Sequence, residues 1–127
     1  MSNHAIDQAR GQLKTIKELV YELRNAADRV DGKRVDDAYH AIIEHPLSVL
    51  MRSGWVEYGA EIKPEEYEIL LCWGGPAVRI VGDLNEHFEP ESAHIEYQDW
   101  FTPWGRYPLT VNEECILLEY AQQFYFG

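Results

Sequence analysis

Long apolar runs are absent from this 127-residue sequence. No stretch approaches the ~20 consecutive apolar residues that are needed to span a bilayer. The N-terminal segment MSNHAIDQARGQLK is polar where a secretory signal peptide would carry its apolar stretch. These absences predict a cytoplasmic protein without membrane contact, and the chain length predicts one domain over residues 1–127.

Cysteine is scarce as well, because only Cys72 and Cys115 are present. Two cysteines cannot form a disulfide framework. Both stand in apolar stretches, LLCW and ECILL, which is typical of reduced thiols in a core. We therefore expect both to be small buried core residues.

Metal-binding and catalytic motifs are also missing. The five histidines form no HExxH motif and no i, i+4 pair on a predicted helix, and the chain has no CxxC motif. We therefore expect no enzymatic activity, no cofactor and no bound metal. The alternative is a small hydrolase or transferase that uses Cys72, or His94 and Glu96 together with Asp99.

Basic residues are few in the second part of the chain. Residues 1–53 hold eight Lys or Arg and eight Asp or Glu, whereas residues 54–127 hold three and fourteen. The net charge of −11 therefore belongs to residues 54–127. Because nucleic-acid binding depends on Lys and Arg that neutralise phosphates, we expect no direct nucleic-acid binding and a protein or ribonucleoprotein partner with a basic surface. The alternative is an acidic surface that serves only solubility.

An amphipathic helix is predicted for residues 6–30, with Ser2 or Asn3 as its cap and Asp31-Gly32 as its stop. This pattern favours packing onto the chain's own sheet. The alternative is half of a coiled coil, which would make the protein a homodimer or a larger structural oligomer. The apolar residues alternate at spacings of three and four: Ile6, Ala9, Leu13, Ile16, Val20, Leu23, Ala27 and Val30.

The remaining elements complete an α+β pattern. A second helix is predicted for residues 33–44, and a third after Thr110, which stands three residues before Glu113 in a capping-box spacing. Strand patterns occur in PLSVLMRSGW, YEILLCW, AVRIVGDL and AHIEYQDWF, with a tight hairpin at GGP. We therefore expect an antiparallel meander of three to four strands, packed by two N-terminal helices and one C-terminal helix. Residues 1–45 form the neutral helical part, and residues 46–127 form the acidic sheet with the last helix.

Aromatic residues are concentrated in the acidic part, which holds fourteen of the sixteen. Those in QDWFTPWGRY follow a strand and lie in a Pro/Gly loop, where Trp, Tyr and Arg are typical of binding hot spots. The alternative is an aromatic minicore that seals the sheet edge. The predicted partner-binding residues are Asp83, Glu86, Glu89, Glu91, Asp99, Trp100, Trp104, Arg106 and Tyr107.

Three segments resemble a known group of proteins: LSVLMRSGW, EILLCWGGPAVRIVGDL and IEYQDWFTPWGRY. They are similar to small acidic proteins encoded by phages and integrative elements of proteobacteria, among the genomic neighbours of anti-CRISPR and anti-restriction genes. The resemblance covers roughly residues 45–127 and carries no catalytic signature. It implies an anti-CRISPR-like inhibitor in the host cytoplasm that binds a defence complex and occupies a nucleic-acid site on it.

Overall fold

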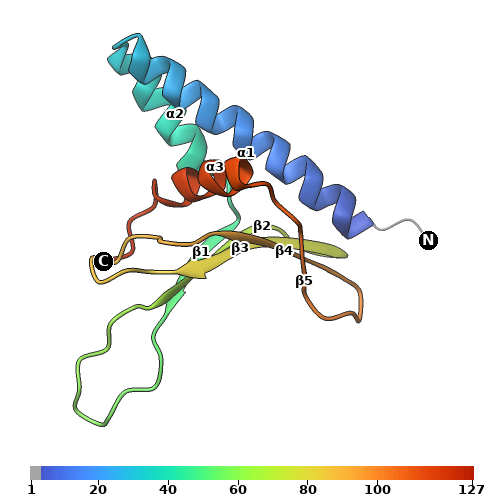
Figure 1. Ribbon diagram of the computed structural model, residues 1–127, viewed down its shortest axis with the longest axis vertical. Coiled ribbons are helices and arrows are strands. Elements are labelled where there is room, and N and C mark those ends of the chain that lie inside the picture. The colour runs from blue at the N-terminus through green and yellow to red at the C-terminus, as the bar shows by residue number, and fades with distance from the viewer. Residues whose placement is uncertain (1–3) are drawn as a thin grey trace.

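The computed structural model describes residues 4–127 and has the α+β architecture that the sequence predicts. Its antiparallel sheet has the strand order β1-β2-β3-β4-β5, and the helices of the described residues lie on one face of that sheet (Figure 1). Within residues 4–127, no helix is both long and apolar enough to cross a membrane. The predicted caps Ser2 and Asn3 lie outside the described residues. The elements are α1 (His4–Asp28), α2 (Gly32–Glu44), β1 (Ser48–Arg52), β2 (Glu66–Cys72), β3 (Pro76–Asp83), β4 (His94–Asp99), β5 (Gly105–Arg106) and α3 (Val111–Ala121).

Each strand pairs with its neighbour in sequence, which confirms the predicted meander. Gly74 makes the β2–β3 reversal with a φ of 123°, a conformation that favours glycine. The sheet has one strand more than the three to four that the sequence predicted, because β5 pairs with β4 in the segment that was expected to be a loop. Pro103 and Pro108 flank β5, and prolines cannot donate to a ladder, which explains why this strand has only two residues.

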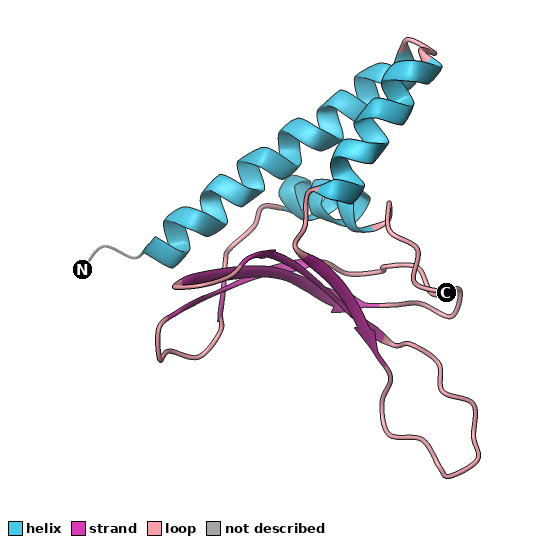
Figure 2. Cartoon of the chain, turned by 180° about the vertical axis from the view of Figure 1, so that it is seen from behind, coloured by secondary structure: helices cyan, strands magenta, loops and turns pink. Residues whose placement is uncertain are grey.

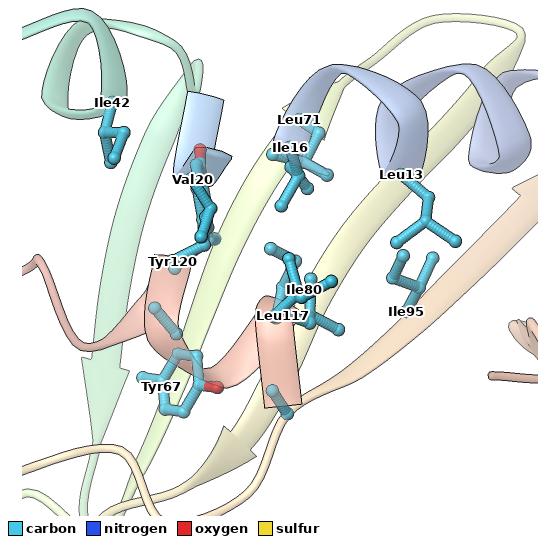
Figure 3. Packing of buried hydrophobic residues seen from close by; sticks show 14 of the residues in the cluster. Leu13, Ile16, Val20, Ile42, Tyr67, Leu71, Ile80, Ile95, Leu117 and Tyr120 are labelled. Atoms are coloured by element: carbon cyan, nitrogen blue, oxygen red, sulfur yellow. The ribbon is translucent and has the colours of Figure 1, made fainter. Parts of the chain in front are cut away.

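The seam of α1 packs onto the chain's own sheet and onto α3, as the sequence favoured over a coiled coil. The central seam residues Ala9, Leu13, Ile16 and Val20 are fully or almost fully buried, so the fold already covers the surface that a coiled-coil partner would need. The side chains from α1, the sheet and α3 that meet in this core (Figure 3) include Leu13, Ile16, Val20, Ile80, Ile95 and Leu117.

Burial at the ends of α1 differs from the predicted seam. Ala5 and Ala26 are buried in place of Ile6 and Ala27, and Val30 lies beyond the helix and is exposed. The C-terminal half of α1 packs against α2 and extends away from the sheet (Figure 2). A different side of the helix is therefore covered there than over the sheet.

The shorter helices begin at the caps that the sequence supplies. The Asp31 side chain accepts a hydrogen bond from the Arg34 N–H, and Thr110 forms the predicted capping box with Glu113. Lys17 on α1 also donates to Glu113 at 2.7 Å, and this hydrogen bond lowers the pKa of the Glu113 carboxyl. The ion pair joins the first helix to the last one.

The two cysteines do not behave alike. Cys72 is half-buried against the core, whereas Cys115 is exposed, so the prediction that both are buried was wrong for Cys115. On α3 the side chains of Ile116, Leu117 and Tyr120 point into the core, and helical geometry turns residue 115 outward. An apolar neighbourhood in sequence does not fix the direction of one helical side chain.

Candidate protein-binding surface

One face of the sheet is covered by helices and the other is bare (Figure 2). On the bare face, Arg79 of β3 contacts carboxylates from both neighbouring strands, 2.9 Å from Glu68 and 2.7 Å from Glu96. The Trp104 ring lies over this guanidinium, with 3.9 Å between Cζ and the ring centroid. Two carboxylates and an indole therefore fix Arg79 in place.

A hollow of about 450 Å³ lies over the bare face. It is lined by side chains from all five strands, including Arg52, which pairs with Glu66, and Arg106 at the opposite border. Two of the three lining arginines are thus engaged by glutamates on adjacent strands. The hollow is close to charge-balanced, so the net negative charge of the protein is displayed elsewhere.

The structure spreads the predicted partner-binding residues along the sheet. A first group, the carboxylates Asp83, Glu86, Glu89 and Glu91, belongs to the end of β3 and the loop that follows it. Asp99 and Trp100 lie at the far end of β4, roughly 23 Å from Asp83, because Asp99 pairs with Pro76 seven residue steps away along β3 and a strand rises ~3.3 Å per residue. The segment after them returns to the middle of the sheet, where Trp104 stacks on Arg79, Arg106 pairs with Glu96 and Tyr107 follows.

The first group belongs to an acidic end, which we define as residues 53–65 together with residues 83–93. Both segments leave the sheet from the same place, because Glu66 pairs with Asp83 and the Leu84 N–H donates to the Glu65 carbonyl at 2.8 Å. The carboxylates of the acidic end are Glu57, Glu61, Glu65, Asp83, Glu86, Glu89 and Glu91. Lys63 is the only Lys or Arg in these two segments.

Hydrogen bonds within the β3–β4 loop fix its conformation. The Asn85 side chain accepts hydrogen bonds from the His87 and Glu89 N–H groups, at 2.8 and 3.1 Å. A further bond at 2.9 Å runs from the Glu91 N–H to the Asp83 carbonyl. Because the loop is closed by these bonds, Glu86 and Glu89 are presented on a fixed frame and point into solvent.

Residues 53–65 form an arm that projects from the sheet (Figures 1 and 2). Two aromatic side chains on it are fully exposed, Trp55 at 105% and Tyr58 at 108%. Neither was among the predicted site residues, because Trp55 was assigned to the strand pattern PLSVLMRSGW and Tyr58 to no motif. A signal was present, because both aromatics stand between Gly54 and Gly59 in a segment with no helix or strand periodicity that could turn them into a core.

The far end of the sheet, together with the segment that returns from it along β4, is the aromatic end, which we define as residues 73–75 and 99–107. Trp100 is 65% exposed and Phe101 is 101% exposed, so neither ring belongs to the core. The Trp100 indole lies directly against Gly75, where an added Cβ would come within 1.9 Å of Nε1. Trp104 and Tyr107 are half-buried instead, on Arg79 and against the core, as the minicore alternative expects.

The residues of the enzyme alternative have other partners or unfavourable surroundings. Burial raises the pKa of the Cys72 thiol, which lowers the fraction of nucleophilic thiolate. Glu96 is engaged by Arg79, and the Asp99 carboxylate accepts the Trp100 N–H at 2.9 Å. His94 lines the hollow on the bare face. Among residues 4–127, no three His, Cys, Asp or Glu side chains are grouped so that they could hold a metal ion.

Comparisons of the chain with protein families, with curated proteins and with solved structures find no match.

Proposed function

We propose that this protein is a non-enzymatic inhibitor that binds a basic surface on a host nucleic-acid-handling complex through its acidic end. One observation carries the proposal: seven carboxylates and two fully exposed aromatic side chains share one end of the sheet, with a single lysine among them. The resemblance of three segments to accessory proteins of mobile elements supports a defence complex as the target.

The carboxylates would act mainly before contact. Surface charges of one sign create a field that steers an oppositely charged partner and raises the association rate, and they also disfavour partners of the same sign. At the acidic end this field is concentrated, because Lys63 offsets only one of the seven carboxylates. A surface that binds phosphates is basic, and it is therefore complementary to this end of the protein.

Trp55 and Tyr58 would supply the burial that exposed charges do not. Large aromatic side chains that fill pockets on a partner account for most of the binding energy in many interfaces, and charged rims contribute less. Both rings protrude from the arm without intramolecular cover. A partner pocket that accepts them would remove apolar surface from water without disturbing the core of this protein.

Catalysis is less well supported than binding. A nucleophile needs a lowered pKa or an adjacent base, whereas the Cys72 thiol has a raised pKa. The Arg79 guanidinium engages the carboxylate of Glu96, which would otherwise be the natural base beside His94. The half-buried ion pairs of Arg79 and the indole stacked on it are more simply explained as support for the sheet.

A pull-down and a phage-plating assay test this proposal together. The tagged protein should capture a nucleic-acid-binding complex from lysate of a defence-proficient host, and its expression should raise phage plating on that host. Two variants should lose both effects: Glu86→Lys/Glu89→Lys/Glu91→Lys and Trp55→Ala/Tyr58→Ala. A matched control changes the net charge equally on the helical half: Glu18→Lys/Asp36→Lys/Glu44→Lys, at exposed positions.

The control should retain capture and inhibition if the acidic end is the binding surface. Circular dichroism and thermal melting must show that each variant is folded. If the control lost capture and inhibition as strongly as the acidic-end variant, net charge alone would explain the effect, and the proposal would be contradicted. Wild-type protein that captures no nucleic-acid-binding complex and leaves plating unchanged would also contradict it.

A further inference from the structure

The edge strand β1 is unlike the other long strands of the sheet. β2 alternates buried and half-buried residues, whereas four of the five β1 residues are exposed, on both faces of the sheet. The exposed side chains include Val49, Leu50 and Met51. Only β2 pairs with β1, so its outer edge presents backbone N–H and C=O groups that have no strand beside them.

Proteins usually protect such an edge with charges, proline or a bulge. Within β1, the only charged residue is Arg52 at its end, which is already paired with Glu66 on the neighbouring strand. No carboxylate occurs from Pro46 to Val56, the stretch with which the acidic part of the chain, residues 46–127, begins. The edge is therefore apolar, nearly neutral and open to another strand.

We propose that β1 pairs with β1 of a second copy of this chain, antiparallel and centred on Leu50, to form one continuous sheet across a two-fold axis. In this register Leu50 faces Leu50, Val49 faces Met51, and Ser48 faces Arg52. The first two kinds of pair are apolar, and the third sets a neutral serine opposite a charged arginine. No like charges therefore face one another. The edge is therefore complementary to itself, which is the requirement for a two-fold interface.

The opposite edge of the sheet argues against a head-to-tail chain of copies. β5 has two residues and is flanked by prolines, so it cannot offer a ladder as long as β1. The antiparallel arrangement also directs the acidic ends of the two copies away from each other, because each arm leaves from the end of its own β1. Each acidic end has seven carboxylates, and the separation between the two ends keeps their mutual repulsion small.

The size of the interface sets its expected strength. Leu47, Val49, Leu50 and Met51 together expose on the order of 400 Å² per copy, about half of the ~800 Å² of a standard interface. We therefore expect a dimer that dissociates on dilution. This proposal is independent of the proposed inhibitor function.

Sedimentation measurements from about 1 µM to about 1 mM protein, a range that covers weak interfaces, test the dimer. The mass should rise from one chain to two across the series. Leu50→Lys places two like charges on the axis and should leave a monomer at all concentrations. Val30→Lys, an exposed apolar position on the helical half, is the matched control and should still dimerise. Wild-type protein that stays monomeric throughout would overturn the proposal.

Cross-linking tests the register. In a Cys72→Ser/Cys115→Ser background, Leu50→Cys should form a disulfide-linked dimer under mild oxidation, because facing residues lie ~4.5–5.5 Å apart at Cα. Ser48→Cys should not, since four residues of strand separate the two copies of position 48, roughly 13 Å. A dimer that Leu50→Lys leaves intact, or that Ser48→Cys traps in place of Leu50→Cys, would overturn the β1 pairing centred on Leu50.

Discussion

The two ends of the sheet carry the two properties that the sequence suggested for a single surface. The acidic end has seven carboxylates, one lysine and two fully exposed aromatics on an arm. The aromatic end has three exposed aromatics, Trp73, Trp100 and Phe101, and two half-buried ones, Trp104 and Tyr107. Only the acidic end combines a cluster of carboxylates with exposed aromatic side chains. This comparison favours the acidic end as the proposed interface and gives Trp104 a structural role over Arg79.

The core that joins the two ends should give the largest effect on stability. Ile80 lies at the centre of β3 and is fully buried between the sheet and the helices. Ile80→Ala should lower the free energy of unfolding by about 3 kcal/mol, from lost burial and the cavity it leaves. Phe101→Ala, at a fully exposed position, should change it by less than about 0.5 kcal/mol. Urea denaturation measures both, and equal effects would contradict the assignment of core and surface.

Exposed aromatics at the two ends should differ in binding. Trp55→Ala with Tyr58→Ala should weaken binding to the captured partner by about 2 kcal/mol or more, mainly through faster dissociation. The matched pair Trp100→Ala and Phe101→Ala removes two exposed rings from the aromatic end and should leave the dissociation rate unchanged. Surface plasmon resonance separates the rates. The reverse result, with loss only in the Trp100 and Phe101 variant, would move the interface to the aromatic end.

Trp104 should behave as a support of the bare face. Its ring stacks on the Arg79 guanidinium, and such contacts contribute ~0.5–2 kcal/mol. Trp104→Ala should therefore lower the unfolding free energy by about 1 kcal/mol and leave partner affinity unchanged once the variant is folded. Thermal melting and the same binding assay provide the two readouts. A large loss of affinity without loss of stability would restore Trp104 to the binding surface.

His45, on the helix-covered side of the sheet, should make the stability of the fold slightly dependent on pH. The ring of His45 meets the Tyr120 hydroxyl at 2.7 Å, and burial lowers the pKa of this imidazole. Because the unfolded chain then binds the proton more readily, stability should fall as pH drops below the ordinary histidine pKa of ~6.5, until the lower folded value is passed. His45→Gln should flatten this slope between about pH 7 and pH 5. An exposed control, His40→Gln, should keep it.

The elements of the fold were predictable because they depend on local rules. The three-and-four spacing of α1, the capping box at Thr110 and the glycines of the β2–β3 hairpin each act within a few residues. β5 escaped prediction because two residues between prolines carry no strand periodicity. Its pairing depends on β4, which lies several residues away in sequence.

The candidate site was only partly predictable for a related reason. The acidic composition located the charge in the correct part of the chain, but which charges meet depends on how the strands are ordered and how long they are. Eight residues of β3 separate Asp83 from the turn near Trp100, so proximity in sequence did not become proximity in space. Conversely, Leu84 hydrogen-bonds to Glu65, which joins two loops that are distant in sequence.

The central claim is that the acidic end attracts a basic partner, and the association rate as a function of salt tests it most directly. For the wild type, the rate constant should fall by about tenfold or more between ~0.05 M and ~0.5 M NaCl, as the Debye length shortens. Glu86→Lys/Glu89→Lys/Glu91→Lys should associate slowly at low salt with little salt dependence, whereas Glu18→Lys/Asp36→Lys/Glu44→Lys should retain most of the wild-type slope. Identical slopes for all three proteins would contradict the account.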